Sequence, residues 1–299
     1  MSGYLIGGSP AIKRIRSLLT KLSGQTSPLI ITGELGVGKF LLATRIHANS
    51  LLKNHPFESV DFSNLREHEQ RIRLLGGSPP DLPTTRRSVL EMPTTVILKH
   101  IDCTPKFLQE RLTEAIQNKE VVRLGTNQVR PVRCRLLFIF NDHPKILLKK
   151  GSIYTGLFKI LSRYQIIHIP TLKERKEDIK DLAQHFVTQY QVERYRKLDK
   201  KFIEMLMKHK WKSNILEFKA FIKALDHPPA EVLIDQNDTI GLSMMNMMID
   251  EAKEFSLKDA LSKIGDSLTR RTWKRQNKNN LKTSYALGMS EGTVRNVLR

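Results

Sequence analysis

The chain has little cysteine and no long apolar run, and both absences limit what it can be. Only Cys103 and Cys134 occur among the 299 residues, without a C-x-x-C pair or a nearby histidine pair at ligand spacing. A disulfide framework and a zinc site are therefore not supported, and we expect both thiols to be buried. No apolar run approaches the roughly 20 residues that cross a bilayer, and the first residues lack the apolar core of a signal peptide. These features predict a cytoplasmic protein without a membrane partner.

Acidic residues are scarce relative to basic ones. Thirty Asp and Glu stand against 50 Lys and Arg, which gives a formal net charge of +20. This excess favours a polyanionic partner, and double-stranded DNA suits it better than an anionic membrane surface. The length and the 40% hydrophobic content allow one full α/β core and a second, small domain.

The apolar pattern changes near Pro170. Before it, short runs rich in branched residues alternate with helical patterns, which predicts a mostly parallel sheet flanked by helices. The expected strands lie within 28–33, 94–102, 135–142 and 165–170. After it, helical patterns alone occur, over 172–195, 199–211 and 214–225. We expect an α/β domain over 1–171, a helical subdomain over 172–226, a linker over 227–255 and a DNA-binding domain over 256–299.

A glycine-rich loop follows the first expected strand. Gly33, Gly36, Gly38 and Lys39 fit the G-x-x-x-x-G-K pattern of a phosphate-binding loop between a strand and a helix. Such glycines let backbone N–H groups turn toward a phosphate, and the lysine ammonium reaches the terminal phosphates. Phe40 stands where most of these loops have a Ser or Thr hydroxyl for Mg²⁺, and its ring offers no such oxygen. A tight strand-to-helix turn without a ligand is the alternative.

The order of the motifs resembles that of the AAA+ enhancer-binding proteins, which activate sigma-54 RNA polymerase. GELGVGKFLLATRIHANS, at 33–50, is similar to the family's GExGTGKxxxAxxIHxxS, and LKERKEDIKDLAQHF, at 172–186, to its LRERxEDIxxLxxxF. WKSNILEF, at 211–218, resembles the family's WPGNVREL. The resemblance implies an AAA+ P-loop fold with an α-helical lid. It also implies the layout of the short members, which have no receiver domain and respond to a separate partner.

The resemblance also implies where a nucleotide would lie. Ile6 and Gly7 match the place where the family's chain passes the adenine, Asn141 belongs to the sensor I strand, and Arg163 matches one arginine of the arginine-finger pair. Since the family commonly has Glu at position 40, Phe40 is a smaller departure from it than from other P-loops. The predicted cofactor-binding residues are Ile6, Gly7, Gly33, Gly36, Val37, Gly38, Lys39, Phe40, Asn141 and Arg163.

Several departures from the family fall on groups that ATP hydrolysis requires. Lys99 and His100 replace the acidic pair that ends the family's strand TLFLDE, and they can neither hold Mg²⁺ nor polarise a water molecule. The sensor II arginine aligns with Leu216, and Asp102 lies too far along to compensate. We expect negligible turnover, no catalytic residue and no metal ligand. Binding of ATP or ADP stays open, because Lys39 and the loop amides can hold phosphates with less dependence on Mg²⁺.

The last 44 residues are basic and have helical patterns. The stretch LKTSYALGMSEGTVRNVLR, at 281–299, predicts two helices with a turn at Gly288 and an N-cap at Ser290. It resembles the Fis-type helix-turn-helix that ends the family's proteins, and by resemblance residues 256–268 pair with a second copy. The expected DNA contacts are Lys282, Ser290, Thr293, Arg295, Asn296 and Arg299. A solvated helix face is the alternative.

Three hypotheses follow. The first is a DNA-binding transcription regulator, a homo-oligomer, whose degenerate AAA+ domain does not hydrolyse ATP and lacks the GAFTGA string that contacts sigma-54. The second is an active, ATP-dependent sigma-54 activator that uses unconventional residues. The third is a non-enzymatic scaffold that binds another acidic molecule or RNA polymerase.

Overall fold

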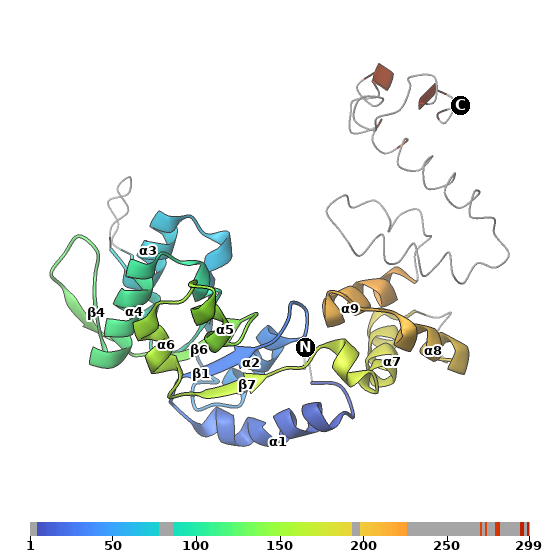
Figure 1. The fold of residues 1–299 in the computed structure, drawn as a ribbon, viewed down its shortest axis with the longest axis horizontal. Helices are drawn as coiled ribbons and strands as arrows, with labels where there is room; N and C mark the ends of the chain where they lie inside the picture. The colour runs from blue at the N-terminus through green and yellow to red at the C-terminus, as the bar shows by residue number, and fades with distance from the viewer. Residues whose placement is uncertain are drawn as a thin grey trace. The chain divides into compact units, whose positions relative to one another are not determined.

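The computed structural model describes residues 5–77, 86–192 and 198–225, together with a few positions between 270 and 298 (Figure 1). The chain divides into two compact units. The first comprises Met1–Leu182 and Trp211–Leu216, and the second comprises Ala183–Lys210 and Glu217–Arg299. Among the described residues, no helix has both the length and the apolar character needed to cross a membrane.

A parallel five-stranded sheet forms the centre of the first unit, which confirms the predicted α/β class. Its strand order is β2-β3-β6-β1-β7. The strands are β1 (Leu29–Thr32), β2 (Glu58–Asp61), β3 (Thr95–Lys99), β6 (Arg135–Phe140) and β7 (Gln165–His168). Thr32 pairs with Phe140 and Lys99 with Ile139, so β1, β6 and β3 end at the same edge of the sheet.

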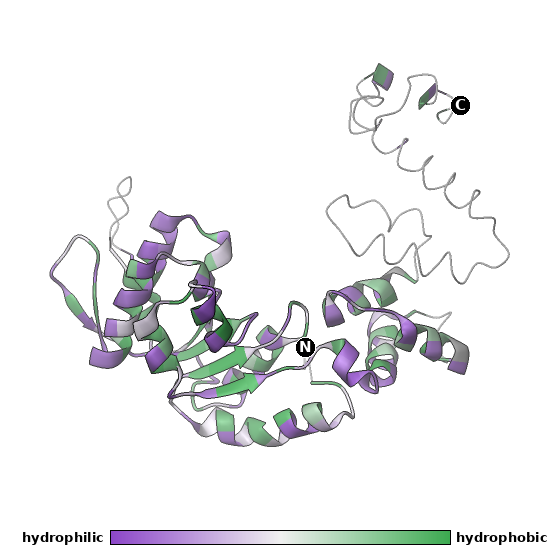
Figure 2. Ribbon diagram, in the orientation of Figure 1, coloured by the Kyte–Doolittle hydropathy of each residue, from purple (hydrophilic) through white to green (hydrophobic). Residues whose placement is uncertain are grey.

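Helices cover both faces of this sheet, and the strands alternate their side chains between two apolar clusters. Ile31 and Ile139 pack with α1 (Pro10–Gly24) and α2 (Lys39–Ala48). Ile30 and Phe138 pack on the other face with α4 (Lys106–Asn118) and α6 (Thr155–Leu161). β1 and β6 are accordingly strongly hydrophobic (Figure 2), because they are buried on both sides.

Shorter elements complete the first unit. Its remaining helices are α3 (Glu67–Leu75), α5 (Pro144–Lys149) and the 3₁₀ helices η1 (Phe62–Asn64), η2 (Val89–Glu91), η3 (Ile101–Cys103) and η4 (Leu172–Arg175). A two-stranded antiparallel hairpin is formed by β4 (Glu120–Val122) and β5 (Val129–Pro131). This hairpin and β2 were not predicted from the sequence, because their exposed positions interrupt the apolar pattern.

The second unit is helical in its described part, as predicted after Pro170. Its elements are most of α7 (Asp178–Tyr190), α8 (Lys200–Lys208) and most of α9 (Asn214–Ala224). Phe186 of α7 and Phe218 of α9 pack with ring centroids 6.2 Å apart. The single helix expected over 172–195 is wrong at its start, since η4 precedes α7 there. The domain limits at 171, 226 and 255 stay predictions.

One expectation about cysteine is wrong. Cys103 is exposed, because it ends the short η3 turn at the surface instead of continuing the buried strand β3. Cys134 is half-buried, and burial raises the pKa of its thiol to about 12.

Candidate nucleotide-binding site

The glycine-rich loop connects β1 to α2 in a conformation that requires glycine. Gly36 has φ +78°, and a β-carbon there would collide with the backbone carbonyl of Ser213. Gly33 has φ +145°, and a β-carbon there would meet the carbonyl oxygen of Ile169. Gly38 is the N-cap of α2 and makes no side-chain cap, so the positive end of α2 faces the loop.

Lys39 lies inside this loop and is 8% exposed. Its ammonium donates to the carbonyl oxygens of Gly33 (2.6 Å) and Glu34 (2.7 Å) and to Oδ1 of Asn141 (2.9 Å). Asn141 directly follows β6, the strand next to β1, so the loop and the end of β6 hold one cation between them. Burial lowers the pKa of Lys39 to about 8, although the carboxylate of Glu34 acts in the opposite direction.

The turn at Trp211–Leu216 packs directly on the loop. Asn214 is 1% exposed and donates from Nδ2 to the carbonyl oxygen of Leu35 (2.9 Å), while its Oδ1 accepts from the backbone N–H of Leu172 (2.7 Å). The backbone N–H of Ile215 donates to the carbonyl oxygen of Gly36 (3.0 Å). The conformation of the loop is therefore fixed from outside as well as by its own glycines.

Asn214→Ala is expected to lower the free energy of unfolding by about 1–3 kcal/mol, because it leaves the N–H of Leu172 buried without its acceptor. The left-handed φ of 54° at this position adds to the cost, since alanine tolerates it poorly. Asn49→Ala is the matched control, because Asn49 is exposed and bonds only one nearby carbonyl in the described structure. Urea unfolding of both variants measures the difference, and equal stabilities would contradict the role given to Asn214.

A charged cluster occupies the edge of the sheet where β2 and β3 end. Asp61 accepts from the ammonium of Lys99 (3.1 Å) and from Nδ1 of His100 (2.9 Å). Because an ionised carboxylate can only accept, Nδ1 of His100 carries the proton. Burial alone would raise the pKa of Asp61, but the hydrogen bonds from His100, Ser63 and Lys99 hold it well below its usual range.

Phe40 joins this cluster to the loop. The ammonium of Lys99 lies over the ring of Phe40, 5.2 Å from its centroid, within the range of a cation–π contact. Phe57 supports the same ring edge to face at 6.0 Å. The two sequence departures at 40 and 99 are therefore in contact with each other.

Two protein families match this chain, one over the sheet and its loop and one over the segment that follows. The family described as the sigma-54 interaction domain matches residues 5–167, more than half of the chain. The chain belongs to the sigma-54 interaction domain family. The family described as the AAA+ ATPase lid domain matches residues 173–259.

Individual relatives and solved structures are similar over much of the chain. The regulatory protein AtoC of Escherichia coli (strain K12) is 27% identical over 96% of this chain, and the transcriptional regulatory protein ZraR of the same organism is 30% identical over 72%. The chain spans 65% of AtoC and 50% of ZraR. NtrX from Brucella abortus, crystallised in complex with ATP, aligns with a TM-score of 0.68 at 22% identity, over 99% of this chain and 69% of that one. At that identity the likeness shows the fold.

The site does not fit a magnesium ion, although other P-loop proteins place one beside the loop. Such an ion needs carboxylate or hydroxyl oxygens with a carboxylate at the end of a neighbouring strand, whereas β3 ends at Lys99 and is followed by His100. The one carboxylate in the cluster, Asp61, is already bound by both. Among the described residues, no group of three or more His, Cys, Asp or Glu side chains is placed to hold a metal.

The remaining predicted nucleotide residues, Ile6, Gly7 and Arg163, do not all lie at the loop. Gly7 packs against Asp178 of α7, and Arg175 donates to the carbonyl oxygen of Val37 (2.9 Å), so the segment with Ile6 and Gly7 adjoins the loop through these neighbours. Arg163 precedes β7 and therefore lies at the opposite edge of the sheet from the loop of its own chain. A role for Arg163 at the nucleotide requires a second copy.

The predicted DNA contacts fall almost wholly outside the described residues. This is so for Lys282, Ser290, Thr293, Asn296 and Arg299. Arg295 is described: it is helical and exposed, and the neighbouring Val294 is buried. The helix-turn-helix itself stays a prediction.

Asp61 and Asn214 were not predicted from the sequence as part of the site. Asp61 ends a strand with a single buried residue, and its contact with Lys99 depends on the strand order, which the sequence does not give. Asn214 stands in the WKSNILEF match but was not singled out. A signal was available, because an asparagine in a turn between two helical patterns often adopts a left-handed φ.

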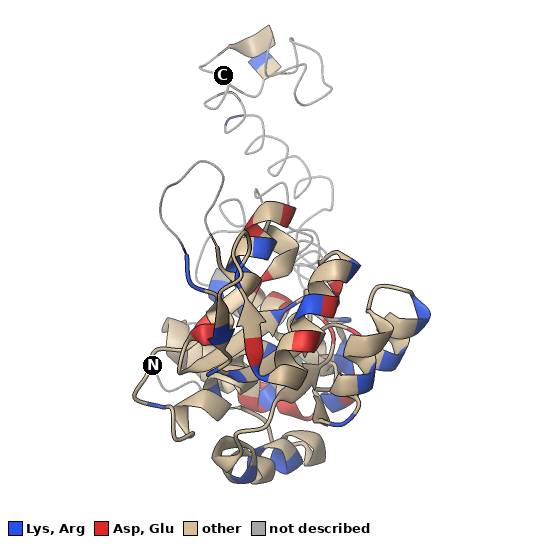
Figure 3. Ribbon diagram, turned by 90° about the vertical axis from the view of Figure 1, so that its left-hand side faces the viewer, with Lys and Arg blue, Asp and Glu red and all other residues tan. Residues whose placement is uncertain are grey.

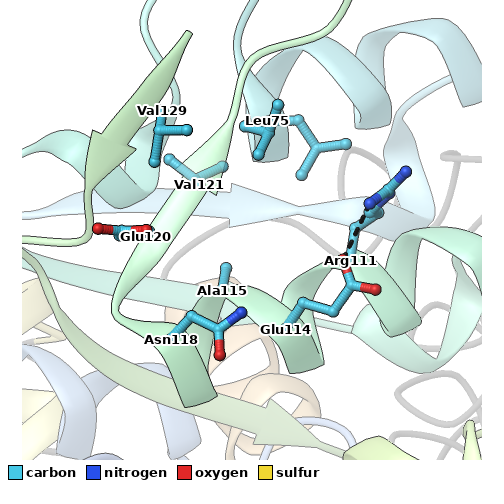
Figure 4. A pocket seen from close by; sticks show the side chains of 9 residues that line it. Leu75, Arg111, Glu114, Ala115, Asn118, Glu120, Val121 and Val129 are labelled. Carbon is cyan, nitrogen blue, oxygen red and sulfur yellow. Dashed lines mark hydrogen bonds and ion pairs between the residues drawn. The ribbon is translucent and has the colours of Figure 1, made fainter. Parts of the chain in front are cut away.

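A groove lies elsewhere, between α4 and the β4–β5 hairpin (Figure 4). Leu75, Ala115, Val121 and Val129 form its apolar wall, and the Arg111–Glu114 ion pair (3.0 Å) lies at its rim. None of its lining residues belongs to the predicted nucleotide site. The hairpin precedes β6, so the groove is not at the edge where the loop lies.

Proposed function

We propose that the chain is a cytoplasmic, DNA-binding transcription regulator whose AAA+ domain binds ATP or ADP but does not hydrolyse ATP. The proposed absence of hydrolysis rests on the Lys99–Asp61–His100 cluster. Hydrolysis needs a bound metal, a polarised water and charge stabilisation together. This cluster offers two nitrogen groups where those functions need carboxylates.

Nucleotide binding has independent support. The loop keeps its three glycines, its lysine and an uncapped helix N-terminus. NtrX, which shares the fold, was crystallised with ATP and with ADP. We therefore assign to this chain the same ligand class, held by Lys39 and the backbone of residues 33–40.

The assignment of DNA as partner rests on the relatives and on charge. AtoC and ZraR are named as regulators, and residues 256–299 carry ten Lys and Arg against three Asp and Glu, whereas the other 255 residues carry 40 against 27. On the face shown in Figure 3, basic and acidic residues of the first unit are interspersed. The tail is thus the segment best suited to a phosphate backbone, and we propose that it acts within a homo-oligomer.

Direct activation of sigma-54 polymerase is not part of the proposal. The GAFTGA string is absent from the sequence, so the usual contact with sigma-54 has no counterpart. RNA polymerase remains a candidate partner through another surface.

A gel-shift titration over a range of salt concentrations tests the DNA-binding part. We expect the chain to bind duplex DNA. The logarithm of the association constant should fall linearly with the logarithm of the salt concentration, as counterion release requires. If the chain instead captures RNA polymerase and has no affinity for DNA, it is an interaction scaffold and the proposed DNA-binding function is wrong.

Affinity for ATP is expected to fall as the pH rises through 8. Lys39 has its pKa lowered to about 8, so its positive charge is present below that pH and is lost above it. Between pH 8 and pH 9 the protonated fraction falls about fivefold, and the affinity should fall by a similar factor. Titration calorimetry checks this, because binding at pH 8 should also take up close to half a proton. Constant affinity over this range would mean that Lys39 does not bind the phosphates as an ammonium.

A further inference from the structure

We propose that Lys99 supplies the positive charge that a magnesium ion provides in other phosphate-binding loops, so that the chain binds a nucleoside triphosphate without a divalent metal. The inference rests on the proposed binding of nucleotide at the loop. The ligand is then the metal-free triphosphate, and Lys99 is a residue that recognises it.

Lys99 lies at the end of β3, close to the glycine-rich loop. β3 ends at Lys99, whose partner in the sheet is Ile139 of β6. Two residues beyond Ile139, Asn141 accepts from the ammonium of Lys39 (2.9 Å). The ammonium of Lys99 lies over Phe40, the residue that follows Lys39 in the chain. Lys99 thus reaches the loop from the strand end at which other P-loop proteins place their metal-binding carboxylate.

The contacts of Lys99 leave it able to bind phosphate. Its ammonium has three N–H donors, and Asp61 accepts at 3.1 Å. The side chain is 25% exposed, so the head group is held in place without being enclosed. The ring of Phe40 orients the cation but takes none of its hydrogen bonds in the way that an oxygen would.

The charge of the site also fits a triphosphate without a metal ion. Apart from Glu34, whose carboxylate the family's GExGTGK loop also has, the side chains of Lys39, Lys99 and Asp61 give the phosphates a net charge of +1. A site with one lysine, one Mg²⁺ and two carboxylates has the same net charge. Asp142, the nearby carboxylate after Asn141, is paired with Lys150 (2.5 Å) and changes this balance little. A triphosphate therefore meets the usual charge at this loop without the ion.

Titration of the full chain with ATP in excess EDTA and in excess MgCl₂ tests the inference. We expect the two dissociation constants to agree within about threefold, since the cation is already part of the chain. Lys99→Gln is expected to weaken ATP binding about tenfold or more in EDTA while leaving AMP binding nearly unchanged, because the missing charge faces the terminal phosphates. Lys99→Arg should retain most of the ATP affinity. Lys53→Gln, which removes an exposed charge at the far end of α2, should change neither.

The outcomes separate the inference from the function on which it rests. Absence of ATP binding in both conditions would overturn the proposed nucleotide site and the inference with it. Binding that requires Mg²⁺ would overturn the inference alone. Equal losses of ATP and AMP affinity in Lys99→Gln would also contradict it, because they would indicate a structural role. A melting curve for each variant shows that it is folded before it is titrated.

Discussion

Lys39→Met is expected to weaken binding of ATP and ADP at least about a hundredfold, the largest effect of any single substitution in the site. The ammonium is buried and is the only side-chain cation in the described structure that donates to the loop carbonyls of Gly33 and Glu34. Methionine has a similar length but no charge and no donor. A phosphate chain in the loop would then face carbonyl oxygens without a cation between them.

Fluorescence titration with a labelled nucleotide measures this loss, and Lys53→Met serves as its control. Lys53 is exposed in the turn after α2, so the control removes the same charge from the same region without touching the loop. The substitution at 39 also leaves three acceptor oxygens without their donor, which is expected to cost stability, so both variants need thermal melts. A folded Lys39→Met protein that binds ATP normally would contradict the assignment of the loop.

Deletion of residues 256–299 is expected to lower the affinity for duplex DNA at least about a hundredfold near physiological salt. The deleted segment holds ten of the 50 Lys and Arg and all six predicted DNA contacts. The remaining chain keeps a positive charge, so weak and strongly salt-dependent binding should persist.

The same deletion is expected to leave ATP affinity unchanged, because every residue assigned to the nucleotide lies before residue 164. Arg295→Ala in the full chain is the finer variant, since Arg295 is exposed beside the buried Val294. Filter binding over a salt series compares the three proteins. If the truncated chain binds DNA as tightly as the full chain, residues 256–299 are not the DNA-binding segment.

The central strands were predictable because their residues are buried on both faces. β1 and β6 are apolar at nearly every position, so a short continuous run marks them without any knowledge of their neighbours. β2 has a single fully buried residue, Val60, and the β4–β5 hairpin has Val121. Strands at an edge or outside the main sheet carry too few apolar positions to stand out from a loop.

The candidate site was predictable only where its residues follow one another in the chain. The loop with Lys39 and the replacement at Lys99 and His100 are local patterns. Their joining through Asp61 and Phe40 depends on β3 lying next to β2 and near β1, which is a property of the sheet. The sequence therefore indicated that acidic groups were missing, and the structure added that the replacements form one bonded cluster.

Release of inorganic phosphate from saturating ATP in the presence of Mg²⁺ is the measurement that decides whether this site hydrolyses ATP. We expect no release above the rate of the protein-free buffer, because Lys99 and His100 are both bonded to Asp61 and the three side chains neither hold a metal nor polarise a water molecule. Steady, Mg²⁺-dependent release by the purified full chain, abolished in Lys39→Met, would contradict it.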